Sequence, residues 1–166
     1  MKKGDSSRFV KRISIRSSPE KVYNSWATSA GLESWFLRKA EFQTIDGRLR
    51  DNQQFAQQGD KYHWLWHGYD DTVSENRFVL SANGIDLFQF EFTAGCIVTV
   101  SINKEAGETI CELTQEKLPD NQDITDHLYV LCGEGWTFYM TNLKSLLEGG
   151  IDLRNKNVEL KNMVNA

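Results

Sequence analysis

The chain has 166 residues, a formal net charge of −4, and 40% hydrophobic and 25% charged residues. That length is typical of one domain, which buries about 70% of its unfolded surface and so needs no disulfide or metal to complete its core. The negative charge argues against nucleic acid as the main partner, because phosphate binding needs clustered Lys and Arg.

The first predicted elements are an edge strand and two short helices. Residues 9–16 alternate apolar and polar, and the basic residues of the first sixteen positions protect an exposed edge. The alternative for this basic segment is a docking patch for an acidic partner. Ser18 and Pro19 predict one helix start and Ser29 predicts a second. The basic residues are Lys2, Lys3, Arg8, Lys11, Arg12 and Arg16.

The middle of the chain reads as strands joined by short turns. Asn83-Gly84 is the strongest hairpin signal. Many alternating strands with short connections indicate an antiparallel sheet with one solvated face. The predicted strands cover residues 39–45, 53–57, 61–67, 77–81, 85–92, 96–103 and 108–115.

One long amphipathic helix follows, from near Asp123 to about Glu148. Gly133 and Gly135 lie inside it, and each costs about 0.5–1 kcal/mol relative to Ala, which indicates a bend or the close approach of another backbone. This helix is the only element large enough to cover the apolar face of the sheet. A curved sheet closed over a helix leaves a cavity suited to apolar ligands. Residues 152–166 are expected to form an ordered strap or a frayed tail.

The cysteines and histidines do not predict a metal or disulfide site. Three cysteines without a CxxC pair indicate buried thiols in a reducing compartment. In the predicted last hairpin, Cys111 lies opposite Val100 and not opposite Cys96. His63 and His67 would lie about 13 Å apart on a strand, too far to share one zinc ion. We expect no metal and no cofactor.

Neither the N-terminus nor any internal run predicts a membrane or export signal. The first residues lack the apolar stretch of a secretory signal. No run reaches the ~18–20 apolar residues of a membrane helix. We therefore expect a cytoplasmic protein with no membrane partner.

The sequence shows no nucleophile elbow and no phosphate loop. Glu91, Gln115 and His127 are candidate acid–base groups, but Glu91 and His127 are expected to face solvent and Gln115 to lie at a strand end. Aromatic residues are the stronger clue, although they also suit a filled core. The pocket candidates are Trp35, Phe36, Tyr62, Trp64, Trp66, Phe88, Phe90, Trp136, Tyr139 and Met140.

Several segments, in one order along the chain, carry a resemblance to known proteins. They are residues 13–23, Trp26 with 32–36, 74–79, 98–102 and 109–118, followed by Gly135-Trp136, Asn142-Leu143 and Leu147-Glu148. On these segments the sequence resembles the SRPBCC (START-like, helix-grip) superfamily, and within it the group named after the C-terminal domain of the activator of Hsp90 ATPase. Residues 48–55 depart from the pattern, because a Gly-Gly pair common in the family is missing there.

The resemblance implies an α+β, Bet v 1-like fold, with a curved antiparallel sheet wrapped around a long C-terminal helix and two short helices after the first strand. We expect a single START-like domain over residues 1–166, with its core at about 9–154 and a polar tail at 155–166. The function that the resemblance and the aromatic residues favour is the binding of a small apolar or amphipathic ligand. The alternatives are a chaperone-binding domain of the Hsp90-activator type and an enzyme of the cyclase or hydrolase kind. Monomer and homodimer both remain open.

Overall fold

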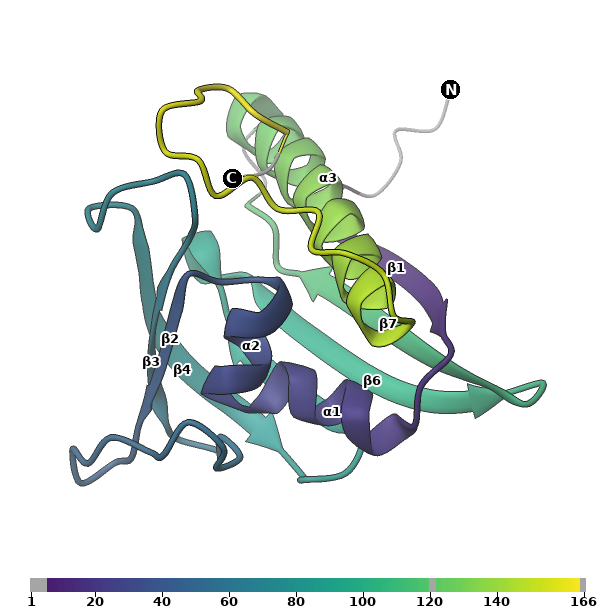
Figure 1. Ribbon diagram of the computed structural model, residues 1–166. Coiled ribbons are helices and arrows are strands. Elements are labelled where there is room, and N and C mark those ends of the chain that lie inside the picture. Colours follow the sequence, from purple (N-terminus) through teal and green to yellow (C-terminus); the bar gives the residue numbers. More distant parts are fainter. Residues whose placement is uncertain (1–5, 120–121, 165–166) are drawn as a thin grey trace.

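A computed structural model describes residues 6–119 and 122–164, with the backbone alone described for 122–127. It is an α+β fold in which a curved antiparallel sheet and a long C-terminal helix pack together (Figure 1). The predicted fold class is therefore confirmed. The elements are β1 (Arg8–Ile15), α1 (Pro19–Ala27), α2 (Ser29–Trp35), β2 (Lys39–Gln43), β3 (Lys61–Leu65), β4 (Ser74–Ala82), β5 (Leu87–Glu91), the 3-10 turn η1 (Thr93–Gly95), β6 (Ile97–Glu105), β7 (Glu108–Glu116) and α3 (Gln122–Leu147).

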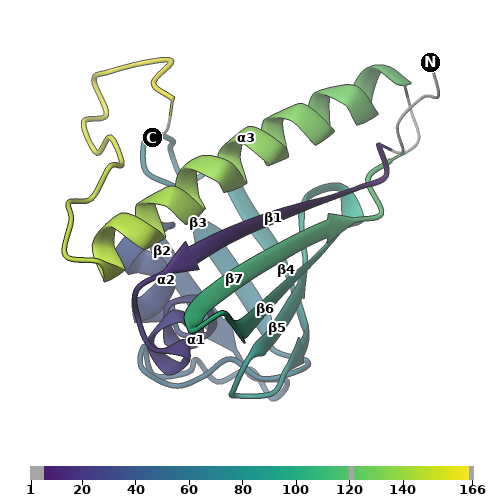
Figure 2. The ribbon, with the colours of Figure 1, turned by 90° about the vertical axis from the view of Figure 1, so that its right-hand side faces the viewer.

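The described sheet has seven strands in the order β1-β7-β6-β5-β4-β3-β2. β1 lies at one edge, as expected of a strand flanked by basic residues. Arg12 forms ion pairs with Glu105 and, at 2.8 Å, with Glu112, so its charge is already matched within the sheet. Figure 2 shows α3 lying over the β1 side of the sheet. Lys2 and Lys3 lie outside the described residues.

The two short helices begin at capping residues. The Ser18 side chain accepts a hydrogen bond from the Lys21 amide at 3.3 Å, and Pro19 occupies the first helical position. The cap of α2 is Thr28, whose hydroxyl accepts from the Gly31 amide at 2.9 Å. The predicted cap at Ser29 is therefore wrong by one residue, because the extended backbone that a cap requires lies at Thr28.

The predicted strand at 53–57 is wrong, because this stretch begins in a turn and continues without regular structure. The Gln53 amide donates to the Asp51 carboxylate at 3.0 Å. A nearby side chain therefore satisfies a backbone N–H that a strand would use for pairing. The Ala56 amide donates to the Ala27 carbonyl at 2.8 Å and ties the loop to α1 rather than to a strand. The other predicted strands exist with shifted ends, and β4 starts three residues earlier than predicted.

The last hairpin has a tighter turn than the sequence analysis predicted. Glu105 pairs with Glu108, which leaves a two-residue turn at Ala106 and Gly107. The register therefore shifts by two, and Cys111 lies opposite Ile102 instead of Val100. Cys96 and Cys111 are not cross-strand partners, as predicted.

The sheet divides at β4. The first half of β4 pairs with β3, from Ser74 to Phe78, and its second half pairs with β5, from Val79 to Ala82. An irregularity in register lies between Val79 and Ser81. The start of β4, from Ser74 to Phe78, is therefore paired with β3 on one side and is not paired with β5 on the other.

Aromatic side chains fill the space between the sheet and the helices. The Trp26 ring lies against Trp35, with centroids 4.5 Å apart, and Trp136 of α3 packs 5.8 Å from Trp26. Such pairs contribute about 0.5–1.5 kcal/mol each beyond the area that they bury. Among the described residues, no helix has the length and apolar character needed to cross a membrane.

Candidate functional site

A pocket of about 340 Å³ lies beside the start of β4, between α3, the β3–β4 loop and the C-terminal segment. A second hollow of about 430 Å³, near the start of α1, is lined mainly by turns and strand ends and holds charges of both signs. We take the first as the candidate site because its walls are mainly aromatic and aliphatic. They are formed by Phe36, Trp66, Tyr69, Val73, Ser74, Glu75, Phe92, Thr93, Leu131, Cys132, Gly135, Trp136, Tyr139, Met163 and Val164.

The structure places four of the ten predicted pocket residues on these walls: Phe36, Trp66, Trp136 and Tyr139. Their rings contact one another directly, with Phe36 lying 4.8 Å from Tyr139 and 5.1 Å from Trp136 between centroids. The other six are buried in the core and do not line the pocket: Trp35, Tyr62, Trp64, Phe88, Phe90 and Met140.

A buried hydrogen bond holds the Trp136 wall in place. The Trp136 Nε1 donates to Gln115 Oε1 at 2.8 Å, and Gln115 is fully buried. Gln115 lies one residue before the end of β7, so the expected position at a strand end is confirmed. Its side chain, however, points into the core beneath α3. It therefore fixes the indole orientation.

Cys132 is the thiol on the pocket wall, and burial raises the pKa of that thiol. We expect N-ethylmaleimide to modify Cys132 before the fully buried Cys96 and Cys111, slowly at neutral pH and faster as rising pH produces thiolate. Mass spectrometry of digested protein at successive times identifies the modified residue. Cys132→Ser is expected to remove the early phase, and early modification of Cys96 or Cys111 would contradict the assignment.

Glu75 is the charged residue among the described walls of the pocket. Its Oε2 lies 3.3 Å from Arg77 Nε, and Arg77 Nη1 lies 3.2 Å from Glu91 Oε1. Glu91 is thus half-buried in an ion pair outside the pocket walls, where it is not free to act as a base. The His127 side chain lies outside the described residues.

Gly135 faces the pocket from the middle of α3. A Cβ added there would meet no atom within 4 Å, and one added at Gly133 would meet only the end of the Lys11 side chain at 3.9 Å. The expected close approach of another backbone is therefore wrong for both glycines. Gly135 leaves space for the pocket, although glycine in a helix costs about 1 kcal/mol.

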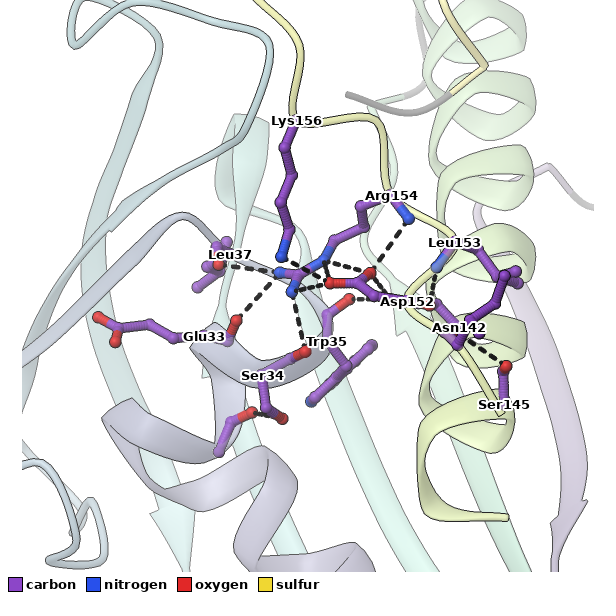
Figure 3. Close-up of polar contacts among 12 residues, drawn as sticks. Glu33, Ser34, Trp35, Leu37, Asn142, Ser145, Asp152, Leu153, Arg154 and Lys156 are labelled. Carbon is purple, nitrogen blue, oxygen red and sulfur yellow. Dashed lines mark hydrogen bonds and ion pairs between the residues drawn. The ribbon is translucent and has the colours of Figure 1, made fainter. Parts of the chain in front are cut away.

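The segment after α3 is an anchored strap at residues 152–154, which fits one of its two predicted forms there, whereas residues 156–164 are exposed (Figure 3). Arg154 is buried, and its guanidinium donates to the carbonyls of Glu33, Ser34 and Leu37 at 2.8–3.1 Å, where α2 ends. It also pairs with Asp152 at 2.7 Å. Burial alone would raise the pKa of Asp152, but hydrogen bonds from Arg154 and Lys156 outweigh it and hold that pKa well below its usual range.

Asn142 of α3 completes the anchor of the strap. It is fully buried, donates to the Trp35 carbonyl at 2.7 Å and accepts from the Leu153 amide at 2.7 Å. The strap then turns back along α3, so that Met163 and Val164 reach the pocket mouth. The wall formed by the tail therefore depends on contacts made ten residues earlier.

Comparison with known proteins agrees with this architecture. A sequence profile described as Activator of Hsp90 ATPase homolog 1-like protein matches residues 16–148. The chain belongs to this family. No curated protein matches its sequence.

Solved structures show the same fold as this member of the Hsp90-activator-like family. A protein from Staphylococcus saprophyticus is 16% identical, with a TM-score of 0.70 over 89% of this chain and 96% of its own. The Aha1 dimer from Colwellia psychrerythraea is 18% identical, with a TM-score of 0.65 over 86% of this chain and 97% of its own. At these identities the likeness concerns the fold alone.

The pocket of this family member also contains residues that the sequence analysis missed. Tyr69 and Val73 lie in the β3–β4 loop, Thr93 lies in η1, and Met163 lies in the tail. Periodicity carries no signal for such positions, because loops place side chains by tertiary contacts. Phe92 was visible in the sequence, since it continues the alternation of Phe88 and Phe90.

The two histidines considered for a metal lie apart from the pocket walls. His63 is on β3 with its Nδ1 3.5 Å from Glu41 Oε2, and His67 follows the strand end. Burial lowers the pKa of His67, and the nearby Arg154 lowers it further. Among the described residues, no group of three His, Cys, Asp or Glu side chains is placed to hold a metal ion.

Proposed function

We propose that this chain is a single START-like domain that binds a small apolar or amphipathic molecule in the pocket beside α3. The observation that carries the proposal is Gly135, a glycine inside a helix with empty space beside it on the pocket wall. Packing does not require glycine at this position, and helix stability disfavours it. A site for a ligand accounts for both facts.

The chemistry of the walls supports binding rather than catalysis. Aromatic and aliphatic groups predominate, with a few polar groups that would orient a ligand. Among the described walls, the Cys132 thiol is not accompanied by histidine, and the carboxylate there, Glu75, is paired with Arg77. The enzyme alternative is therefore less well supported than binding.

The test combines two measurements on the full chain. Native mass spectrometry of protein purified without denaturation is compared with the denatured mass, and an excess that denaturation removes identifies a retained ligand. The neutral fluorescent probe N-phenyl-1-naphthylamine is then titrated into the protein. We expect saturable, one-to-one fluorescence enhancement with quenching of tryptophan emission, because Trp66 and Trp136 line the pocket. Absence of saturable probe binding would overturn the proposal.

A second candidate function is protein interaction, because apolar side chains surround the pocket mouth. Tyr69, Val73 and Leu131 are 55%, 44% and 48% exposed. The family description and the dimeric Aha1 relative suggest a chaperone or a second copy of this chain as the partner. This candidate predicts complex formation with Hsp90 and a higher chaperone ATPase rate, or a dimer by light scattering. If Hsp90 is not bound, its ATPase rate does not rise and no dimer forms, this candidate function is rejected.

A further inference from the structure

The charge of the pocket walls has one sign. Among the described wall residues, Glu75 is the charged group, and Lys, Arg and His are absent from the set. Tyr69, Cys132 and Tyr139 are the other titratable groups there, and burial raises the pKa of Cys132 and Tyr139, so both stay neutral at neutral pH. A ligand in this pocket therefore meets negative charge.

Glu75 points toward the concave side of the sheet because of its register. It pairs with Trp64 across β3 and β4, and cross-strand partners share one face. Trp64 is fully buried in the core, so Glu75 faces inward, with its side chain 16% exposed. A largely desolvated carboxylate attracts a cation more strongly than an exposed one does.

The carboxylate is only partly neutralised by its neighbour. Arg77 is shared between Glu75 and Glu91, so the three side chains carry one net negative charge. The hydrogen bond from Arg77 uses Oε2 of Glu75, and among the described residues Oε1 accepts no side-chain hydrogen bond. One carboxylate oxygen of this wall residue is therefore left to accept a hydrogen bond or to face a positive group.

Six aromatic rings surround the same space. Aromatic faces carry negative electrostatic potential, and several rings around one site attract quaternary ammonium groups. Such a cation is weakly hydrated, so it loses less solvation on entering an apolar pocket than a compact ammonium does. The rings are those of Phe36, Trp66, Tyr69, Phe92, Trp136 and Tyr139.

We propose that the pocket selects amphipathic cations, which are alkyl chains ending in an amine or quaternary ammonium group, with Glu75 as the residue that determines the charge preference. This inference rests on the proposed ligand-binding function and names its ligand class. The alkyl chain packs against the apolar walls, and the positive group lies beside Glu75 among the rings.

The test uses three eight-carbon compounds that displace N-phenyl-1-naphthylamine from the full chain: octyltrimethylammonium, 1-octanol and octanoate. We expect octyltrimethylammonium to compete at about tenfold lower concentration than octanol, and octanoate to compete least well. Added salt should reduce the advantage of the cation, since part of it is electrostatic.

Two variants of the same ion cluster separate charge selection from folding. Glu75→Gln is expected to remove the advantage of the cation over octanol. Arg77→Gln, which removes the competing positive charge, is expected to enlarge that advantage. Equal competition by cation and alcohol in the wild type, or a cation preference that survives in Glu75→Gln, would overturn the inference and leave the binding pocket intact. Absence of probe binding would instead overturn the proposed function itself.

Discussion

Replacing Arg154 with methionine is expected to lower the free energy of unfolding by about 3–5 kcal/mol, the usual cost of removing one partner from a buried ion pair. Methionine preserves the length of the side chain but has no donors. The carbonyls of Glu33, Ser34 and Leu37 would lose their guanidinium partner. Asp152 would lose its buried cation and keep the exposed Lys156 and two amide donors, the Asn142 side chain and the backbone N–H of residue 154. Because α2 carries Trp35 and precedes Phe36, the loss should also loosen one pocket wall.

Urea unfolding followed by tryptophan fluorescence measures this change. Lys156→Met is the matched control, since it removes the exposed partner of the same carboxylate and should cost about 0–1 kcal/mol. Arg154→Lys should recover only part of the stability, because an ammonium cannot reach three carbonyls and a carboxylate together. Equal effects of the two methionine variants would show that the strap is not held by Arg154.

The pH dependence of the same anchor has a defined sign. The folded pKa of Asp152 lies below its unfolded value, so its stabilisation is fully present above the ordinary carboxylate range. It is lost as pH falls through the folded pKa. The difference in stability between wild type and Arg154→Met should therefore be constant near neutral pH and should shrink in strong acid.

Much of the fold could be predicted from sequence because local chemistry and tertiary packing agree. Pro19 starts α1 where expected, and Asn83-Gly84 makes the predicted turn between β4 and β5. The errors occur where the two disagree. Residues 53–57 read as a weak strand, but the side chains around Asp51 and the contact of Ala56 with Ala27 hold them as a loop.

The pocket was less predictable than the fold. The alternation of residues along a strand distinguishes side chains that face the core from those that face solvent, but it does not show where the core contains a cavity. Trp64 and Phe90 have the same inward pattern as Trp66 and Phe92, yet the first two fill the core and the second two line the pocket. The difference coincides with the end of the β4–β5 pairing at Val79 and Phe90, and residue alternation does not predict where such a pairing ends. Gly135 was the residue in the sequence that marked the pocket wall, although the close approach of another backbone expected there is wrong.

Replacing Gly135 with phenylalanine is expected to weaken binding of N-phenyl-1-naphthylamine by at least about tenfold, or about 1.4 kcal/mol, while the protein stays folded. The new ring would extend from the wall of α3 into the space that a ligand would occupy. The first atom of that side chain meets nothing within 4 Å, so it does not strain the helix. Phenylalanine also has a higher helix propensity than glycine, so the free energy of unfolding should not fall.

Two alanine variants separate the closing of the pocket from the change in helix propensity. Gly133→Ala and Gly135→Ala should each stabilise the protein by about 0.5–1 kcal/mol, because both glycines have room for a Cβ. Both should retain probe binding, since a methyl group leaves most of the pocket open. If Gly135→Phe binds the probe as well as the alanine variants do, the ligand lies elsewhere and the glycine does not keep the pocket open. If Gly135→Phe loses binding with its stability intact, the volume beside Gly135 is the binding site.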